Sequence, residues 1–325
     1  MARHNRRPHR RLKAAGAAAA AAAVVAAGSV ALASTPGQQR AAGPVVAGGV
    51  ATYRSDATIG HLTVPASWKK IVIGAGVTLR GNFLIPSERT APLTIRGENA
   101  RTSKLVGDGG HVKDPDFAAV STGASIDLTL RNFTSLDPRF YHVLAKRAKV
   151  LASGIRVIDD RDDYHNNSDG FGGGSGSVIE NSYFDTWDDT FKLYNGDLTV
   201  RNTTVLHNGN GAPVQMAWGD YGHGTLIADG LTVVSHSPNH YNQGVFSWAG
   251  GTQPDSRTIR LTGDGLVRRT AAGMRTAPLY VWKDGVSNKT IHVVGGVCSE
   301  LRSTAANTVL GKGARNDRVR VTGCA

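Results

Sequence analysis

Ile179-Glu180-Asn181 and the next triplet of the same kind, Val200-Arg201-Asn202, decide the fold of this chain. Each triplet ends a short β-rich run with a hydrophobic residue, any residue, and then Asn. The pattern, with Asn, Gly, Asp or Ser in third place, recurs at Leu79-Arg80-Gly81, Ile95-Arg96-Gly97, Leu130-Arg131-Asn132, Leu151-Ala152-Ser153, Ile227-Ala228-Asp229, Leu261-Thr262-Gly263, Val293-Val294-Gly295 and Val321-Thr322-Gly323. The uneven steps between triplets from Leu130 onward indicate the irregular period of a solenoid whose insertions fall in turns.

The triplets predict parallel strands rather than hairpins. The hydrophobic member points inward and stacks on its counterpart in the next coil, and the third residue forms a tight corner where a positive φ is often required. A β-sandwich, the alternative, needs a hairpin turn about every 8–12 residues. We therefore predict an all-β, single-stranded right-handed parallel β-helix of about ten coils from Leu79 onward.

Residues 1–33 are predicted to be a signal peptide. Six positive charges precede an Ala/Val-rich run that closes with Ala31-Leu32-Ala33, a pattern that signal peptidase accepts. An uncleaved membrane anchor is the alternative, but alanine alone inserts poorly. Residues 34–49 indicate a flexible leader, and residues 50–325 then form one catalytic β-helix domain. We expect a secreted, extracellular protein with no stable membrane insertion.

The charge and the cysteines bound the partners. The formal net charge of +12 falls to about +6 (12 − 6) without the predicted signal, which is compatible with an acidic polysaccharide. The sequence contains no Lys/Arg cluster interleaved with aromatic residues, which is the pattern that would indicate binding to nucleic acid. Cys298 and Cys324 are predicted to form a disulfide at the last turn of the fold, and without histidine partners they make no zinc site. We expect a monomer that uses no metal and no cofactor.

A second strand can be aligned in each coil, upstream of the triplets. Strand alternation is expected to send one column of side chains outward at Lys192, Gln215, Phe246 and Tyr280, and a second column at Tyr194, Ala217, Trp248 and Trp282. Sugar rings stack on exposed aromatic side chains of this kind, so the face is predicted to bind polysaccharide. A strip covered by the insertions between coils is the structural alternative.

Three aspartates lie beside this face. Asp188 follows Asp169 after close to one coil of sequence, and Asp189 comes directly next. Adjacent carboxylates repel one another, which raises one pKa and keeps a proton available near neutral pH. One acid and one or more ionised bases are what hydrolysis of a glycosidic bond requires. By contrast, the acidic run from Asp159 to Asp163 is interpreted as a solvated turn.

At this point the sequence resembles glycoside hydrolase family 49, the dextranases and isopullulanase, within the wider pectin-lyase-like β-helix superfamily. The resemblance covers residues 168–218 and rests on Ser168-Asp169-Gly170, on Trp187-Asp188-Asp189-Thr190-Phe191-Lys192-Leu193-Tyr194, and on Ala212-Pro213-Val214-Gln215-Met216-Ala217-Trp218. It implies an inverting hydrolase of α-glucans. The chain has no room for the β-sandwich domain that usually precedes the helix in that family, which leaves the substrate in doubt.

The resemblance also implies roles for residues. Asp188 would be the general acid, and Asp169 and Asp189 would hold and deprotonate the attacking water. Lys192 and Gln215 would bind the sugar whose bond is cut, and the aromatic columns add Tyr194, Trp218 and Trp248 as further substrate-binding residues.

Three other functions stay open. A polygalacturonase-like enzyme would share Asn167-Ser168-Asp169 and Asp188-Asp189, but His223 lies too far beyond Asp189 in the sequence and no Arg-Ile-Lys follows. A pectate-lyase-like enzyme would bind Ca²⁺ through acidic residues and abstract a proton with a basic residue such as Lys192. A non-catalytic carbohydrate-binding solenoid would explain the aromatic columns but not the clustered aspartates.

Overall fold

The computed structural model describes most of the predicted catalytic domain. The described residues are 43–161, 168–194, 196–208, 211–218, 223–235, 244–249, 251–270, 277–282, 288–295, 308–310 and 319–322. The predicted signal peptide, most of the predicted leader, and both cysteines of the predicted disulfide lie outside them. Within the described ranges, no helix has the length and apolar character needed to cross a membrane.

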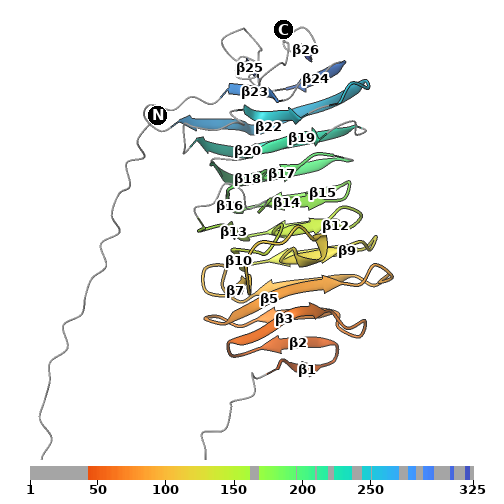
Figure 1. The fold of residues 1–325 in the computed structure, drawn as a ribbon, viewed down its shortest axis with the longest axis vertical. Helices are drawn as coiled ribbons and strands as arrows, with labels where there is room; N and C mark the ends of the chain where they lie inside the picture. Colours follow the sequence, from red (N-terminus) through yellow and green to blue (C-terminus); the bar gives the residue numbers. More distant parts are fainter. Residues whose placement is uncertain are drawn as a thin grey trace, which may run out of the picture. The chain divides into compact units, whose positions relative to one another are not determined.

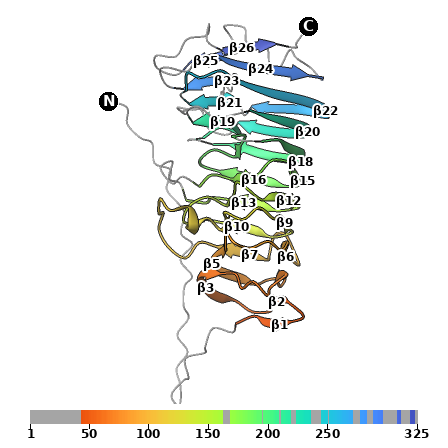
Figure 2. The ribbon, with the colours of Figure 1, turned by 90° about the vertical axis from the view of Figure 1, so that its right-hand side faces the viewer.

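The strands stack in the order of the sequence (Figures 1 and 2) and form three parallel ladders, which we call faces A, B and C. Face A comprises β2 (Val50–Tyr53), β4 (Lys70–Ile73), β6 (Leu93–Gly97), β9 (Asp127–Arg131), β12 (Lys149–Ser153), β15 (Ser177–Glu180), the first parts of β18 (Leu198–His207), β20 (Gly224–Ser235) and β22 (Asp255–Thr270), then β24 (Lys289–Val294) and β26 (Val319–Thr322). Face B comprises β7 (Lys104–Val106), β10 (Thr134–Leu136), β13 (Arg156–Ile158), β16 (Tyr183–Thr186) and the second parts of β18, β20 and β22.

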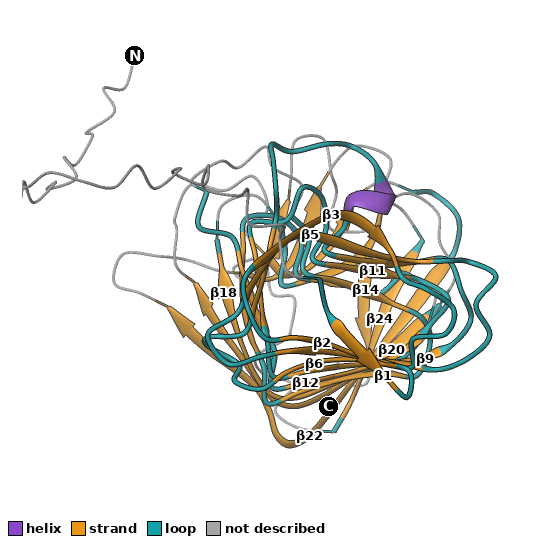
Figure 3. Cartoon of the chain, turned by 90° about the horizontal axis from the view of Figure 1, so that it is seen from below, coloured by secondary structure: helices purple, strands orange, loops and turns teal. Residues whose placement is uncertain are grey.

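Face C carries the candidate site. It comprises the second parts of β3 (Ala57–Thr63) and β5 (Thr78–Ile85), whose first parts belong to face B, then β8 (Val120–Thr122), β11 (Val143–Ala145), β14 (Phe171–Gly173), β17 (Phe191–Lys192), β19 (Val214–Trp218), β21 (Gly244–Ala249), β23 (Ala277–Trp282) and β25 (Thr308–Leu310). Viewed from below, the strands of successive coils lie over one another (Figure 3). Only β1 (Val45–Ala47) pairs antiparallel among the described strands, with β2. The predicted all-β parallel solenoid is therefore observed, whereas its right-handed sense and its number of coils stay predictions.

The triplets do mark the turn out of face A. Ile95, Leu130, Ile179 and Val200 lie in one buried column on this face, as predicted. The third residues take positive φ at Asn132 (53°), Asn181 (50°) and Asn202 (41°), and several of the corner glycines do the same. Asn tolerates this left-handed conformation because its short side chain can hydrogen-bond locally, so the corner fixes the register of each coil.

Four triplets were aligned wrongly. Ala152 and Ala228, not Leu151 and Ile227, face inward, because the positive-φ corner is the glycine that follows each triplet, Gly154 (65°) and Gly230 (74°). Leu79 pairs with Leu105 on the side of face B, and Val293 pairs with Ile259 rather than with the expected Leu261. Glycine adopts positive φ whatever residue precedes it, so the corners at Gly154 and Gly230 lie one residue later than the triplets predict.

The expected outer columns of face C are correct at Lys192 and Gln215 but wrong from Ala217 onward, because Ala217 is fully buried in the core. Lys192 pairs with Gln215 as predicted, but Gln215 then pairs with Ser247 and Val214 pairs with Phe246. Phe246 therefore lies beside the inward-facing Val214. Trp248 pairs with Ala217 as expected, but the ladder is irregular between Gln215 and Ala217, and both residues of this pair face the core. Phe246 and Trp248 are 1% and 0% exposed. The prediction that Phe246 and Trp248 face outward is therefore wrong. The expected outward side chains of Tyr280 and Trp282 lie outside the described part of the structure.

Candidate active site

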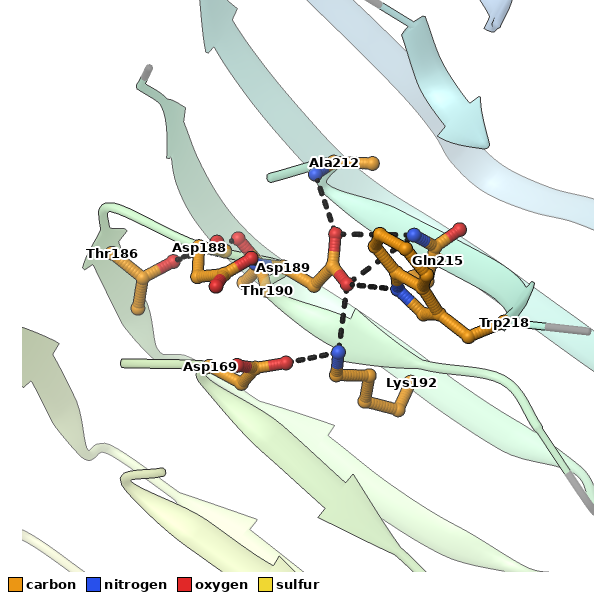
Figure 4. A network of polar contacts seen from close by, with 9 residues as sticks. All are labelled: Asp169, Thr186, Asp188, Asp189, Thr190, Lys192, Ala212, Gln215 and Trp218. Atoms are coloured by element: carbon orange, nitrogen blue, oxygen red, sulfur yellow. Dashed lines mark hydrogen bonds and ion pairs between the residues drawn. The ribbon is translucent and has the colours of Figure 1, made fainter. Parts of the chain in front are cut away.

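The connections from face B to face C bring the three aspartates together. Asp169 lies just before β14, and Asp188 and Asp189 lie just before β17. The amide of Gly170 donates to the carbonyl of Asp189 (2.9 Å), so Asp169 and Asp189 stack in neighbouring coils. One carboxylate oxygen from each aspartate lies within 4.8 Å of the others (Figure 4). The spacing of about one coil between them in the sequence was thus a sound basis for predicting the cluster.

Asp189 is the anchor of the cluster. Its carboxylate accepts hydrogen bonds from the Ala212 amide (2.9 Å), Lys192 Nζ (2.7 Å), Trp218 Nε1 (3.0 Å) and, more weakly, Gln215 Nε2 (3.3 Å) (Figure 4). The side chain is only 1% exposed. Donors that converge on both oxygens fix the orientation of the carboxylate.

Lys192 joins the two buried carboxylates. Its ammonium group forms ion pairs with Asp169 and with Asp189 and lies 5.2 Å from the ring of Tyr141 and 5.4 Å from that of Tyr194. Burial lowers the pKa of Lys192, but the two carboxylates outweigh burial and hold that pKa well above its ordinary value. Burial raises the pKa of Asp169, with Lys192 opposing the change. Lys192 is therefore a fixed cation beneath the cluster.

Asp188 differs from its two neighbours. It is partly exposed, and its carboxylate accepts a hydrogen bond from the Asp189 amide (2.8 Å). Burial and, second, the charge of Asp189 raise the pKa of Asp188 to about 6. A carboxyl group with this pKa keeps a substantial protonated fraction near neutral pH, so Asp188 is the aspartate best suited to donate a proton.

The oxygens of the three aspartates could in principle hold a cation. However, Lys192 Nζ already contacts Asp169 and Asp189, so an ammonium group occupies the place that an ion would take. The residues present fit a metal poorly, and the chemistry they support is proton transfer.

A hollow of about 330 Å³ opens above the cluster. It is lined by Tyr141, Lys146, Asp169, Asp188, Asp189, Lys192, Tyr194 and Trp218. This size falls within the range of small-ligand sites. Tyr194 and Trp218 were predicted to lie here, whereas Gln215 is fully buried behind Asp189.

Trp248 does not belong to the hollow. Its indole is fully buried and donates to Asp255 (3.2 Å), which also binds the buried Arg257. The prediction that Trp248 contacts substrate on an outer face is wrong, because the irregularity between Gln215 and Ala217 turns the pair of Ala217 and Trp248 into the core.

Sequence reasoning missed Tyr141 and Lys146. The His142 amide donates to the carbonyl of Asp169 (2.8 Å), which places Tyr141 directly one coil before Asp169. Counting back one coil from Asp169 would have found Tyr141, since that step equals the step between the triplets that begin at Leu151 and Ile179. Lys146 follows β11 in the same coil and carries no motif of its own.

Residues of the next coil hold the Asp188–Asp189 segment in place. Asn208 Nδ2 donates to Asp185 Oδ1 (2.7 Å) and to the Thr186 carbonyl (3.0 Å), and Thr186 Oγ1 donates to the Asp188 carbonyl (3.0 Å). Gly211 packs against the peptide between the two aspartates, so closely that a Cβ there would overlap the Asp189 nitrogen and the Asp188 carbonyl carbon.

Gly211→Ala is therefore expected to displace the aspartate pair. A shift of about 1 Å costs on the order of 10²-fold in turnover, and kcat should fall by about that factor. The matched control is Gly43→Ala, because an added Cβ at Gly43 meets nothing within 4 Å. Steady-state kinetics of both variants check this, and wild-type kcat in Gly211→Ala would contradict it.

The fold and the site define a class: parallel β-helices with an aspartate–lysine cluster in a surface hollow. The chain is similar to two dextranases, at 21% identity for that of Arthrobacter sp. (strain CB-8) and 23% for that of Arthrobacter globiformis. Each match extends over 177 residues, 49% of this chain but only 27% of the relative. No family model matches. The comparison supports a distant relationship to these dextranases.

Proposed function

We propose that the chain is a secreted polysaccharide hydrolase that acts on an α-glucan by inversion, with Asp188 as general acid. One observation carries the proposal: a carboxyl group with a raised pKa stands beside two buried carboxylates that Lys192 pairs, in a hollow open to substrate. The dextranase similarity supports the substrate class. The predicted signal peptide (1–33), leader (34–49), catalytic domain (50–325) and disulfide belong to the same proposal.

In the proposed reaction, Asp188 gives its proton to the glycosidic oxygen as the bond to the anomeric carbon breaks. Asp169 and Asp189 hold a water and take its proton while its oxygen attacks that carbon from the opposite side. Lys192 stays protonated and keeps both carboxylates oriented. Tyr194 and Trp218 then contact the sugar rings from the walls of the hollow.

The burial of Asp169 and Asp189, rather than the distance between the carboxyl groups, supports inversion. Inverting enzymes hold their two carboxyl groups roughly 6.5–9.5 Å apart and retaining enzymes about 5 Å apart, whereas the nearest oxygens here lie within 4.8 Å. However, Asp169 and Asp189 are only 2% and 1% exposed and are paired with Lys192. A carboxylate held in this way reaches the anomeric carbon more easily through a water than by direct attack.

A glycan screen with NMR of the first product tests the proposal. The purified chain is expected to shorten an α-glucan and to release the anomer opposite to that of the cleaved bond. Retention of configuration would reject inversion and leave the hydrolase. Failure to cleave any α-glucan or other polysaccharide in the screen would reject the hydrolase.

Lys146 favours an acidic polysaccharide as the second candidate substrate. This exposed lysine lines the hollow, and within the described residues it has no ion pair. It therefore supplies a cation for the carboxylate of a uronate, in place of the absent Arg-Ile-Lys motif. Lys146→Gln should lower kcat/KM on a polyuronate but leave an α-glucan unaffected. The lyase alternative loses support, because Asp159 of the acidic run is buried and paired with Arg161 (2.9 Å) rather than solvated as predicted.

A further inference from the structure

Partly exposed aromatic side chains gather on one side of the coil. Within the described residues, seven Phe, Tyr and Trp side chains are neither buried nor fully exposed. Six of them lie in face C or in its connections, namely Phe117, Phe140, Tyr141, Trp187, Tyr194 and Trp218. The seventh is Tyr183, the first residue of β16 in face B. Stacking that served only to pack loops would show no such preference for the face that carries the hollow.

Two stacks continue from the hollow toward the N-terminal coils. In the first, Tyr141 stacks on Phe140 (4.4 Å between centroids), and Phe140 in turn faces His111 (6.1 Å). In the second, His61 faces Phe117 (4.6 Å), and the Arg139 guanidinium lies 4.4 Å from the centre of the Phe117 ring. Arg139 and Phe140 are adjacent in the chain, so the two stacks are neighbours, and we call them together the row. The first stack reaches Lys192, whose Nζ lies 5.2 Å from the Tyr141 ring centre.

Apart from His61 in β3, the residues of this row lie in the connections between strands. Phe117 ends the single-turn 3-10 helix Pro115–Phe117, which contacts β5 and β8 and lies outside the strand layer (Figure 3). Arg139 is held by Asp108 (3.8 Å) and by the Gly110 carbonyl (3.3 Å). The side chains are therefore ordered before any ligand arrives, which reduces the entropic cost of binding.

We propose that these six residues, His61, His111, Phe117, Arg139, Phe140 and Tyr141, form a binding ridge for the polysaccharide chain beyond the catalytic hollow. The inference rests on the proposed function and extends it from one sugar to a polymer. The rings of Phe117, Phe140 and Tyr141 are partly exposed, and the edges of aromatic rings carry partial positive charge. Sugar oxygens can therefore lie against these edges and accept hydrogen bonds from Arg139 and the histidines, while continuity through Tyr141 leads the chain into the hollow.

Affinity electrophoresis in gels containing dextran, another α-glucan or polygalacturonate tests the ridge. Asp188→Asn serves as the background so that the polymer stays intact. Phe117→Ala and Arg139→Gln are expected to weaken the retardation by the polymer about two- to tenfold, the value of one aromatic contact. Binding of the corresponding monosaccharide, which is too short to span the hollow and the row together, should not change.

The matched control is Tyr183→Ala. Tyr183 is partly exposed and lies under Arg156 (4.7 Å), but away from face C, so its removal should leave polymer binding unchanged. Equal weakening in Tyr183→Ala, unchanged retardation in both ridge variants, or no retardation of the chain by any of the polymers would overturn the ridge. Hydrolysis by the wild type together with unchanged ridge variants would refute the ridge alone, and polymer binding without hydrolysis would refute only the catalytic proposal.

Discussion

Asp188→Asn is expected to lower kcat by about 10²- to 10⁴-fold on natural polysaccharide, because it removes the proton that the leaving oxygen requires. An aryl glycoside with a good leaving group should lose far less, since its leaving group barely needs protonation. Asp160→Asn is the matched control, because Asp160 is exposed and outside the hollow. Equal losses on both substrates would contradict a general-acid role for Asp188.

The pH dependence gives the same prediction a second test. The pKa of Asp188 is raised to about 6, so its acid form disappears as pH rises through 6. The wild-type rate on natural substrate should therefore fall above pH 6, and Asp188→Asn should lack this decline. A raised carboxyl pKa in the folded state also means that the wild type loses stability as pH rises from the ordinary carboxyl pKa through that raised value. Asp188→Asn should consequently unfold at a higher temperature than the wild type above pH 6.

Lys192→Met is expected to have the largest effect on stability. It leaves Asp169 and Asp189 buried without their cation, and breaking a buried pair in this way costs about 3–5 kcal/mol. For a domain of this size the unfolding midpoint should fall by roughly 10 °C. Lys146→Met, which removes an exposed lysine of the same hollow, should change the free energy of unfolding by less than about 0.5 kcal/mol.

The loss in Lys192→Met should depend on pH with a defined sign. Without the ammonium group the pKa of Asp169, already raised by burial, rises further, so the unpaired Asp169 carboxylate destabilises the fold once it ionises. The gap to the wild type should narrow as pH falls toward 4 and widen at neutral pH. Adding Asp169→Asn and Asp189→Asn should restore part of the midpoint. A midpoint gap that is constant with pH would show that the lysine acts through packing alone.

The sequence determined the fold class. Ile179 and Val200, each followed after one residue by an Asn corner, specify an inward column and a turn, and both signals are local. The sequence also predicted the aspartate cluster, because Asp169 and Asp188 are separated by close to one coil and no insertion lies between them. Where coil length is short and regular, spacing along the chain translates directly into neighbours in space.

Only the tertiary structure decided the rest. Trp248 lies in the core because the β19–β21 ladder is irregular between Gln215 and Ala217, and such an irregularity has no motif in the sequence. Residue type alone does not distinguish the three aspartates. The hydrogen-bond donors around Asp189, the ion pair of Asp169 and the partial exposure of Asp188 distinguish them. Acid and base differ here through desolvation and nearby charge, which are properties of the packed coil and not of any residue in the sequence.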